Sequence, residues 1–326
     1  MKSRRAVLTV LVLAIVVTVV AYVLLLRPTR KRLQTVKIGT FSKALSYTPL
    51  YVAKHFNWFQ GQPALKGLQL DFNEFNDRPA ISAGLAAGDL HLLFCAEIPA
   101  IMISAQGERI RIIKVSSTAT QRVLVRSDSK ITAPADLRGK RVAVLQGTSS
   151  HYCLLKILQT AGLKETDAKL SYMTPNEARA AFESKQLDGW AVWAPFGEQQ
   201  EVRGTGREIG GQGAWIHSIL AVPESVLEHH ADIAEATAAV LQRAKDWIAH
   251  NPDQAQRIAA DALNLDLAVV KQGWPKFNWN SQLTADVLDD IQQKADFLAE
   301  LDKTRQSRRV DIRRDLIAPN YLPGRL

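Results

Sequence analysis

Residues 141–162 read RVAVLQGTSSHYCLLKILQTAG, and this stretch decides the fold class. Its short apolar start, 141–145, is typical of a buried strand. The glycine and hydroxyl residues that follow predict a tight turn into a helix, and Gly162 stands where a left-handed cap is expected. The stretch therefore predicts one strand–turn–helix unit of an α/β protein.

The same alternation of apolar strands and amphipathic helices begins at Val36 and predicts mostly parallel sheets. We expect strands at 36–40, 68–75, 90–95, 110–117, 122–127, 141–145, 169–173, 189–193 and 215–222. Thr48 and Pro49 predict an N-cap followed by proline at the first helical position. Thr174 and Glu177 predict a capping box, while Gly88 and Gly107 each follow a helical stretch.

After Pro223 the strand pattern stops, and helices are expected at 231–250, 252–263 and 282–301. The Arg-rich tail after Lys303 shows no periodic core. A body of about 290 residues exceeds the size at which one core stops growing, so two lobes are expected. Residues 120–214 would form lobe 2, and residues 36–119 plus 215–326 would form lobe 1. Two crossings of the chain between lobes would make a hinge beside a cleft.

The N-terminal segment predicts a membrane anchor. Residues 1–5 form a short basic tail, residues 6–26 are 21 consecutive uncharged and largely apolar residues, and residues 27–35 form a basic linker. Such a run matches the roughly 20 residues that cross a bilayer as a helix. A signal peptide cleaved after Val19-Val20-Ala21 is the alternative, but it would leave an apolar new terminus. We expect an uncleaved transmembrane helix with the body outside.

Charge and cysteine content exclude several classes. The chain has a net charge of +9, but seven basic residues lie before Leu33, so the body carries 34 basic against 32 acidic residues. This balance gives no nucleic-acid footprint. Cys95 and Cys153 are expected to be buried small hydrophobes, because neither CxxC spacing nor a His cluster accompanies them. No metal site and no cofactor are predicted, and glycine-rich nucleotide motifs are absent.

Ligands of open α/β sheets bind beyond the carboxyl ends of strands, so the strand-to-helix turns hold the candidate residues. The candidates in the first half of the chain are Ser42, Ser46, Tyr47, Arg78 and Glu97. Alternatively, Arg78 is a solvated side chain and Glu97 a cap or a restraint on the hinge.

The richest turn contains Gly147, Thr148, Ser149, Ser150 and His151. Free amides at a helix start and hydroxyl donors suit an oxyanion. Alternatively, Ser149 or Ser150 caps its own helix.

Two tryptophans lie in the strand expected at 189–193. Their odd spacing places Trp190 and Trp193 on opposite faces. We expect Trp193, nearest the end of the strand, to face the cleft, and Trp190 to pack in the core.

From about Val36 to Pro319 the sequence resembles the aliphatic sulfonate binding proteins of ABC importers, within the nitrate, sulfonate and taurine binding family. The matching segments are 147–152, 176–182, 188–196, 96–99 and 251–255. The resemblance implies a type II periplasmic binding fold whose closing cleft holds an anion through hydroxyls and amides. It also implies that Ser42, Ser46, Glu97, Thr148, Ser149 and His151 lie near the ligand. Cys95 and Cys153 depart from the family pattern.

These observations predict the solute-binding component of an ABC importer, anchored in the cytoplasmic membrane on its periplasmic side. The expected ligand is a small organic oxyanion, first of all an aliphatic sulfonate. The expected partners are a permease and its ATPase, and the protein is expected to be a monomer. Two alternatives stay open: an enzyme of the pyrimidine-synthase or dehydratase type that uses Lys43 or His151, and a tethered ligand sensor.

Overall fold

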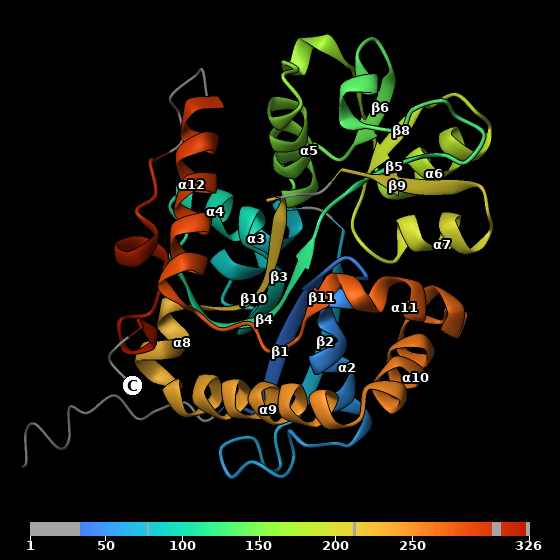
Figure 1. Ribbon diagram of the computed structural model, residues 1–326. Helices are drawn as coiled ribbons and strands as arrows, with labels where there is room; N and C mark the ends of the chain where they lie inside the picture. Colours follow the sequence, from blue (N-terminus) through green and yellow to red (C-terminus); the bar gives the residue numbers. More distant parts are fainter. Residues whose placement is uncertain (1–32, 77, 211–212, 302–307, 324–326) are drawn as a thin grey trace, which may run out of the picture. The chain divides into compact units, whose positions relative to one another are not determined.

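The computed structural model describes residues 33–76, 78–210, 213–301 and 308–323. Thr35–Leu326 form one compact unit, which contains a six-stranded and a five-stranded sheet. We call these sheets, with their helices, lobe 1 and lobe 2 (Figure 1). The predicted anchor, 6–26, lies outside the described residues, as do residues 1–5 and most of the linker. Within the described residues, no helix is both long enough and apolar enough to cross a membrane.

Lobe 1 is built on the six-stranded sheet, in which the strands follow the order β11-β4-β10-β3-β1-β2. Its strands are β1 (Thr35–Phe41), β2 (Gln69–Phe75), β3 (Leu92–Ala96), β4 (Ile110–Thr120), β10 (Trp215–Pro223) and β11 (Phe277–Asn278). Its helices are α2 (Thr48–His55), α3 (Arg78–Ala86), α4 (Glu97–Ala105), α8 (Glu224–His229), α9 (Ala231–His250), α10 (Pro252–Leu263), α11 (Leu267–Gly273) and α12 (Ala285–Leu301). Helix α2 packs against α9 and α10.

Lobe 2 is built on the five-stranded sheet, in which the strands follow the order β7-β6-β8-β5-β9. Its strands are β5 (Val123–Arg126), β6 (Arg141–Val144), β7 (Lys169–Tyr172), β8 (Gly189–Ala191) and β9 (Gly206–Ile209). Its helices are α5 (Ser149–Thr160), α6 (Pro175–Glu183) and α7 (Phe196–Val202). Trp190 is 1% exposed and packs with Phe182 and Leu187 in the core of this lobe, as predicted.

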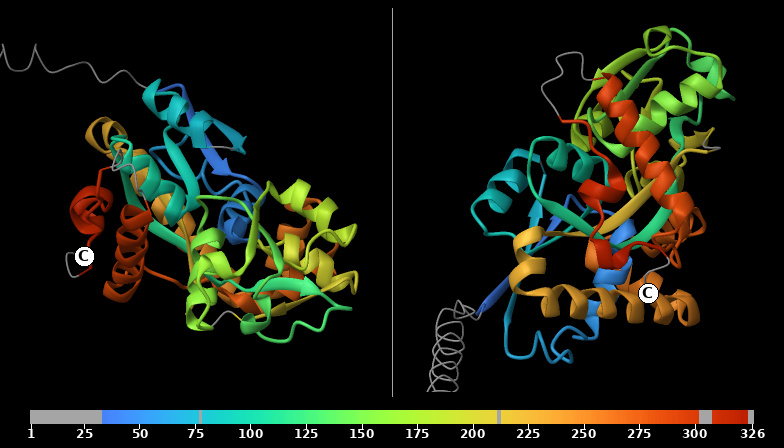
Figure 2. Two further views of the ribbon diagram at one scale, coloured as in Figure 1. Left: turned by 90° about the horizontal axis from the view of Figure 1, so that it is seen from above. Right: turned by 90° about the vertical axis from the view of Figure 1, so that its left-hand side faces the viewer.

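The chain crosses between the lobes twice. It leaves lobe 1 between β4 and β5 and returns between β9 and β10. The two crossings lie side by side, because the Gln121 N–H donates to the Ala214 carbonyl at 2.8 Å. Figure 2 shows the two lobes from two further directions.

Both sheets are mixed, so the expectation of mostly parallel sheets was wrong. β10 runs antiparallel to β3 and β4, and β5 runs antiparallel to β8 and β9. The strands beside the crossings cause this difference. The chain leaves lobe 1 through β4 and returns through β10, so these two strands run in opposite directions, and β5 and β9 are related in the same way in lobe 2.

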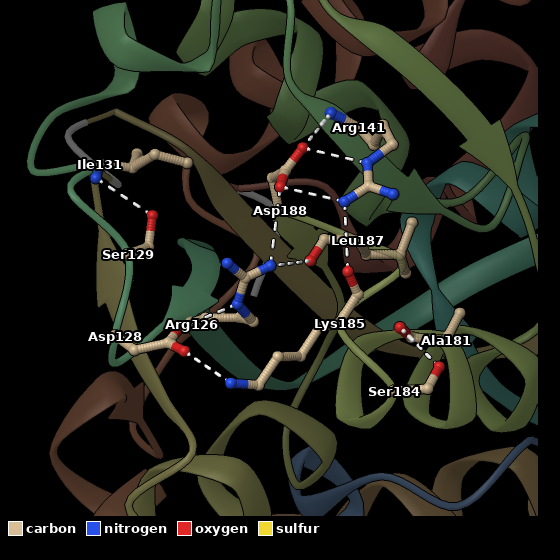
Figure 3. A network of polar contacts seen from close by, with 10 residues as sticks. All are labelled: Arg126, Asp128, Ser129, Ile131, Arg141, Ala181, Ser184, Lys185, Leu187 and Asp188. Carbon is tan, nitrogen blue, oxygen red and sulfur yellow. Dashed lines mark hydrogen bonds and ion pairs between the residues drawn. The ribbon is translucent and has the colours of Figure 1, made fainter.

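A polar network fixes the amino ends of two lobe 2 strands (Figure 3). The Asp188 carboxylate accepts from the Arg141 backbone N–H at 2.9 Å and from its Nε at 3.2 Å. Arg126 Nη1 lies 3.6 Å from the same carboxylate. These contacts tie the start of β6 to the start of β8. The carboxyl ends of these strands, from which the turns to Gly147 and Trp193 leave, are therefore held in register.

Several local predictions are confirmed. Thr174 and Glu177 form a capping box, and Gly88, Gly107 and Gly162 have positive φ angles of 70°, 101° and 72°. Such angles are readily available to glycine, which has no Cβ.

Three other predictions were wrong. Tyr47, not Thr48, is the N-cap of α2, because Thr48 is already helical. Strand β11 follows Pro223, although its two residues are too few to produce a pattern. The tail contributes to the core, since Ile312 and Leu316 are buried. They lie in a π-helix, whose residue spacing differs from that of α-helices and of β-strands.

A buried ion network joins three elements of lobe 1. Lys294 Nζ of α12 lies 2.6 Å from Glu97 Oε1 and 2.6 Å from Asp290 Oδ2, and it donates to the Trp215 carbonyl at 2.9 Å. The other Glu97 oxygen accepts from the His217 N–H at 2.9 Å. The side chains of Lys294 and Glu97 are fully buried. The network therefore fastens the start of β10, at the second crossing, to α4 and α12.

Replacing Lys294 by methionine is expected to lower the free energy of unfolding by about 3–5 kcal/mol, because Glu97 would stay buried without its cation. Urea unfolding measures this change. Lys37→Met is the matched control, since its pair with Asp89 is solvent-exposed and such pairs contribute about 1 kcal/mol or less. Equal losses in the two variants would contradict the stabilising role of the buried network.

Candidate ligand-binding site

A recess lies between the two lobes. The residues that line it are Phe41, Ala44, Ser46, Tyr47, Ala96, Pro99, Thr148, Ser149, Ser150, Trp193, Ile216 and Ser218. The space inside it is about 410 Å³, including the part open to solvent. None of these lining residues carries a charged side chain.

The turn after β6 brings the start of α5 to the recess. Gly147 has a φ of 70°, and Thr148 is the N-cap. The Thr148 hydroxyl donates to the Leu145 carbonyl at 2.7 Å and accepts from the His151 N–H at 3.3 Å. The cap is therefore Thr148, and the alternative in which Ser149 or Ser150 caps this helix was wrong.

Ser149 presents unused hydrogen-bond donors at the recess. Its side chain is buried, and its Oγ has no hydrogen-bond partner among the described residues. Within that same part of the chain, the backbone N–H groups of Ser149 and Ser150 donate to no acceptor. Unpaired amides at a helix start carry partial positive charge. The helix start therefore offers one hydroxyl and two amides to an anion.

Ser150 and His151 have other roles in the turn. The Ser150 hydroxyl donates to Gln121 Oε1 at 2.8 Å, which ties α5 to the first crossing. Burial lowers the pKa of His151, which favours the neutral imidazole, and its Nδ1 accepts from the Gly147 N–H at 3.4 Å. The His151 and Tyr172 rings lie nearly perpendicular to each other, with their centroids 5.4 Å apart. Its side chain does not line the recess, in contrast to the prediction.

Lobe 1 supplies two of its predicted residues to the recess. Ser46 and Tyr47 line it, and the Tyr47 hydroxyl donates to the Phe41 carbonyl at 3.1 Å. Ser42 does not line it and has a φ of 61°. Arg78 is the first residue of α3; its side chain is outside the described part of the structure, so its ligand role stays a prediction.

Glu97 does not line the recess either. Both of its carboxylate oxygens are bound, one to Lys294 and one to the His217 N–H. The alternative in which Glu97 restrains the hinge describes this placement better than a ligand contact does. The ligand contact expected for Glu97 is not seen at this recess, and its partners Lys294 and His217 could not be predicted because they lie far away in the sequence.

Trp193 lines the recess, but it lies two residues after the end of β8 and packs against the same core cluster that contains Trp190. The expected placement of the two rings on opposite faces of one strand was therefore wrong. The Trp193 Nε1 donates to the Lys43 carbonyl at 3.4 Å, across the lobes.

Ile216 and Ser218 also line the recess, and sequence reasoning missed both as site residues. They lie on β10, whose register with β4 shifts immediately after Ser218. Such an irregularity re-aims a side chain, and it has no signature in the local sequence.

The two cysteines offer no reactive thiolate. Cys95 and Cys153 are free and buried, and burial raises the pKa of both thiols. Because the thiolate is the reactive form, neither residue suits a nucleophile.

Comparisons with known proteins agree with this architecture. A putative aliphatic sulfonates-binding protein of Bacillus subtilis (strain 168) is 28% identical over 82% of this chain and 81% of its own length. A protein of the same description from Escherichia coli (strain K12) is 37% identical, but the match covers 39% of this chain and 41% of that protein. This stretch is less than two thirds of the Escherichia coli relative.

A solved structure and a family model extend the comparison. The periplasmic aliphatic sulphonate binding protein SsuA from Escherichia coli superposes with a TM-score of 0.76 at 25% identity, over 90% of this chain and 95% of that one. It shares the two-sheet α/β fold of type II periplasmic binding proteins. The family model described as NMT1/THI5 like matches residues 45–255, more than half of the chain. The chain therefore belongs to the NMT1/THI5-like family.

Proposed function

We propose that the protein is the extracytoplasmic solute-binding component of an ABC importer and captures a small organic sulfonate between its lobes. One observation carries this proposal: the Ser149 hydroxyl and two neighbouring backbone amides, which have no partner in the part of the chain that the structure describes, lie at a recess between the lobes. Buried polar groups without partners are rare in native proteins, so these donors call for an external acceptor. The names of the relatives support the same ligand class.

The absence of charged side chains among the lining residues favours a singly charged anion. A buried dianion would need a paired cation, because its desolvation is costly. A sulfonate spreads one charge over three oxygens, which hydroxyl and amide donors can bind. The apolar side chains of Phe41, Pro99, Trp193 and Ile216 suit an alkyl chain attached to that head group.

No specific observation favours the enzyme alternative. Lys43 is exposed and does not line the recess, and the His151 side chain faces Tyr172. The sensor alternative shares the same site and differs in the partner. Neighbouring genes for a permease and an ATPase would support transport, and a neighbouring kinase gene would support sensing.

Isothermal titration calorimetry with ethanesulfonate, taurine, nitrate and methylphosphonate tests the ligand class. Ser149→Ala is expected to weaken ethanesulfonate binding by about tenfold to a hundredfold, because a hydrogen bond to a charged group contributes about 1.5–3 kcal/mol. Ser184→Ala, an exposed position outside the recess, is the control and should bind like the unaltered protein. The absence of binding heat for the whole panel would contradict the proposed function.

We also propose that residues 6–26 anchor the protein in the cytoplasmic membrane. This run of 21 residues is long enough to span the bilayer. Full-length protein is expected in the membrane fraction with its N-terminal residues retained, while a chain without residues 2–32 should be soluble. Mass spectrometry of the purified full-length protein checks this. A soluble product that begins at Tyr22 would instead show a cleaved signal peptide.

A further inference from the structure

Lys276 joins the two lobes through three ion pairs. It is the last residue of a 3₁₀ turn, Trp274–Lys276, which follows α11 in lobe 1. Its Nζ lies 2.6 Å from Glu198 Oε1, 3.4 Å from Glu201 Oε2 and 2.5 Å from Glu208 Oε1. Glu198 and Glu201 belong to α7 and Glu208 to β9, all in lobe 2. Helices α7 and α11 pack against each other, as Figure 1 shows.

This cluster borders the ligand recess. Lys276, Glu198 and Glu208 line a neighbouring recess that shares Ser46, Trp193, Ile216 and Ser218 with the first one. Helix α7 begins three residues after Trp193. Lobe 1 also holds the segment before α7, since the Leu45 N–H donates to the Ala194 carbonyl at 3.3 Å. The ion pairs and this hydrogen bond therefore fix the wall that carries Trp193.

We propose that Lys276 is a positioning residue of the ligand site, which holds lobe 2 closed on lobe 1 and so sets the lifetime of the bound state. This inference rests on the proposed function. The side chains are well shielded: Lys276 is 13% exposed, Glu198 2% and Glu208 11%. Pairs so shielded from solvent are screened less than surface pairs. Opening the lobes would separate the ammonium from all three carboxylates.

The charges of the cluster are unequal, because three carboxylates meet one lysine. Arg122 is a further cation that lines the same recess. The pKa of Glu208 is raised to about 7, chiefly by burial; Lys276 opposes the shift, and Glu198 and Glu201 add to it. Glu198 Oε2 is buried and has no hydrogen-bond partner among the described residues. Three carboxylates therefore face two cations, Lys276 and Arg122, in the closed form.

The sign of the pH dependence follows from the raised pKa of Glu208. If opening exposes Glu208, its pKa falls toward the ordinary value of about 4.5, so closure takes up a proton between these two values. This contribution to closure is fully present below about pH 4.5 and is lost as the pH rises through about 7. Lys276 keeps its charge throughout, because the carboxylates around it raise its pKa despite burial.

Ethanesulfonate, which does not titrate in this range, is the probe for the test. Lys276→Met is expected to weaken its binding by about tenfold, through faster dissociation with an unchanged association rate, measured by stopped-flow tryptophan fluorescence. Lys276→Arg should restore part of the loss. Lys271→Met, at an exposed position on α11, is the matched control and should bind like the unaltered protein.

The pH profile gives a second readout that a purely structural role would not produce. The unaltered protein should bind ethanesulfonate more tightly at pH 6 than at pH 8, by up to about tenfold. Glu208→Gln should remove this difference and keep the tighter affinity, because glutamine mimics the protonated carboxyl while Lys276 keeps its ion pairs with Glu198 and Glu201. This variant tests the proposal even where Lys276→Met fails to fold in a thermal melt.

Two outcomes would overturn the inference. One is unchanged dissociation in a folded Lys276→Met variant, and the other is a pH dependence that Glu208→Gln leaves intact. Failure of the unaltered protein to bind any anion of the panel would instead count against the proposed function.

Discussion

The site depends on one physical constraint: polar groups that leave water need partners. At the start of α5 the Thr148 hydroxyl satisfies one helix amide and the Leu145 carbonyl. It does not contact the amides of Ser149 and Ser150 or the Ser149 hydroxyl, and these groups have no other partner among the described residues. These donors are buried at a recess rather than spread over the surface. An anion in that recess would complete the bonds that the chain leaves open.

The arrangement of the two lobes explains how a ligand could favour closure. The donors lie on lobe 2, while Ser46, Tyr47 and Ser218 line the recess from lobe 1. A ligand that touches both walls favours the closed arrangement only through contacts that the open one lacks. Gln121 lies at the crossing and binds both the Ser150 hydroxyl and the Val192 carbonyl. The helix start and the Trp193 wall are therefore connected directly to the place where the chain would bend.

The sequence alone predicted features that depend on residues close together in the chain, such as turns and helix ends. Gly147 and the helix start beside it follow from turn and capping preferences. The placement of Trp193 was not predicted correctly, because the strand ends at Ala191 and the alternation of faces stops there. Contacts between distant residues could not be predicted in this way. Glu97 and Lys294 are 197 positions apart, and no local pattern links them. The π-helix near Ile312 and the register shift after Ser218 also break the periodicities on which such reasoning relies.

The buried ion network around Lys294 lies within lobe 1, whereas the one around Lys276 joins the two lobes, and the two differ in their balance of charge. Within lobe 1, Lys294 meets Glu97 and Asp290, and His217 Nε2 lies 2.9 Å from Asp290. That network joins elements of one lobe, so ligand exchange does not need to break it. Between the lobes, Lys276 faces three carboxylates, one of which has a pKa of about 7. The excess of negative charge weakens the Lys276 contact between the lobes. This contact must open to release ligand, so it cannot be as strong as the Lys294 network that stabilises the core of lobe 1. The unequal charge between the lobes is therefore consistent with reversible closure.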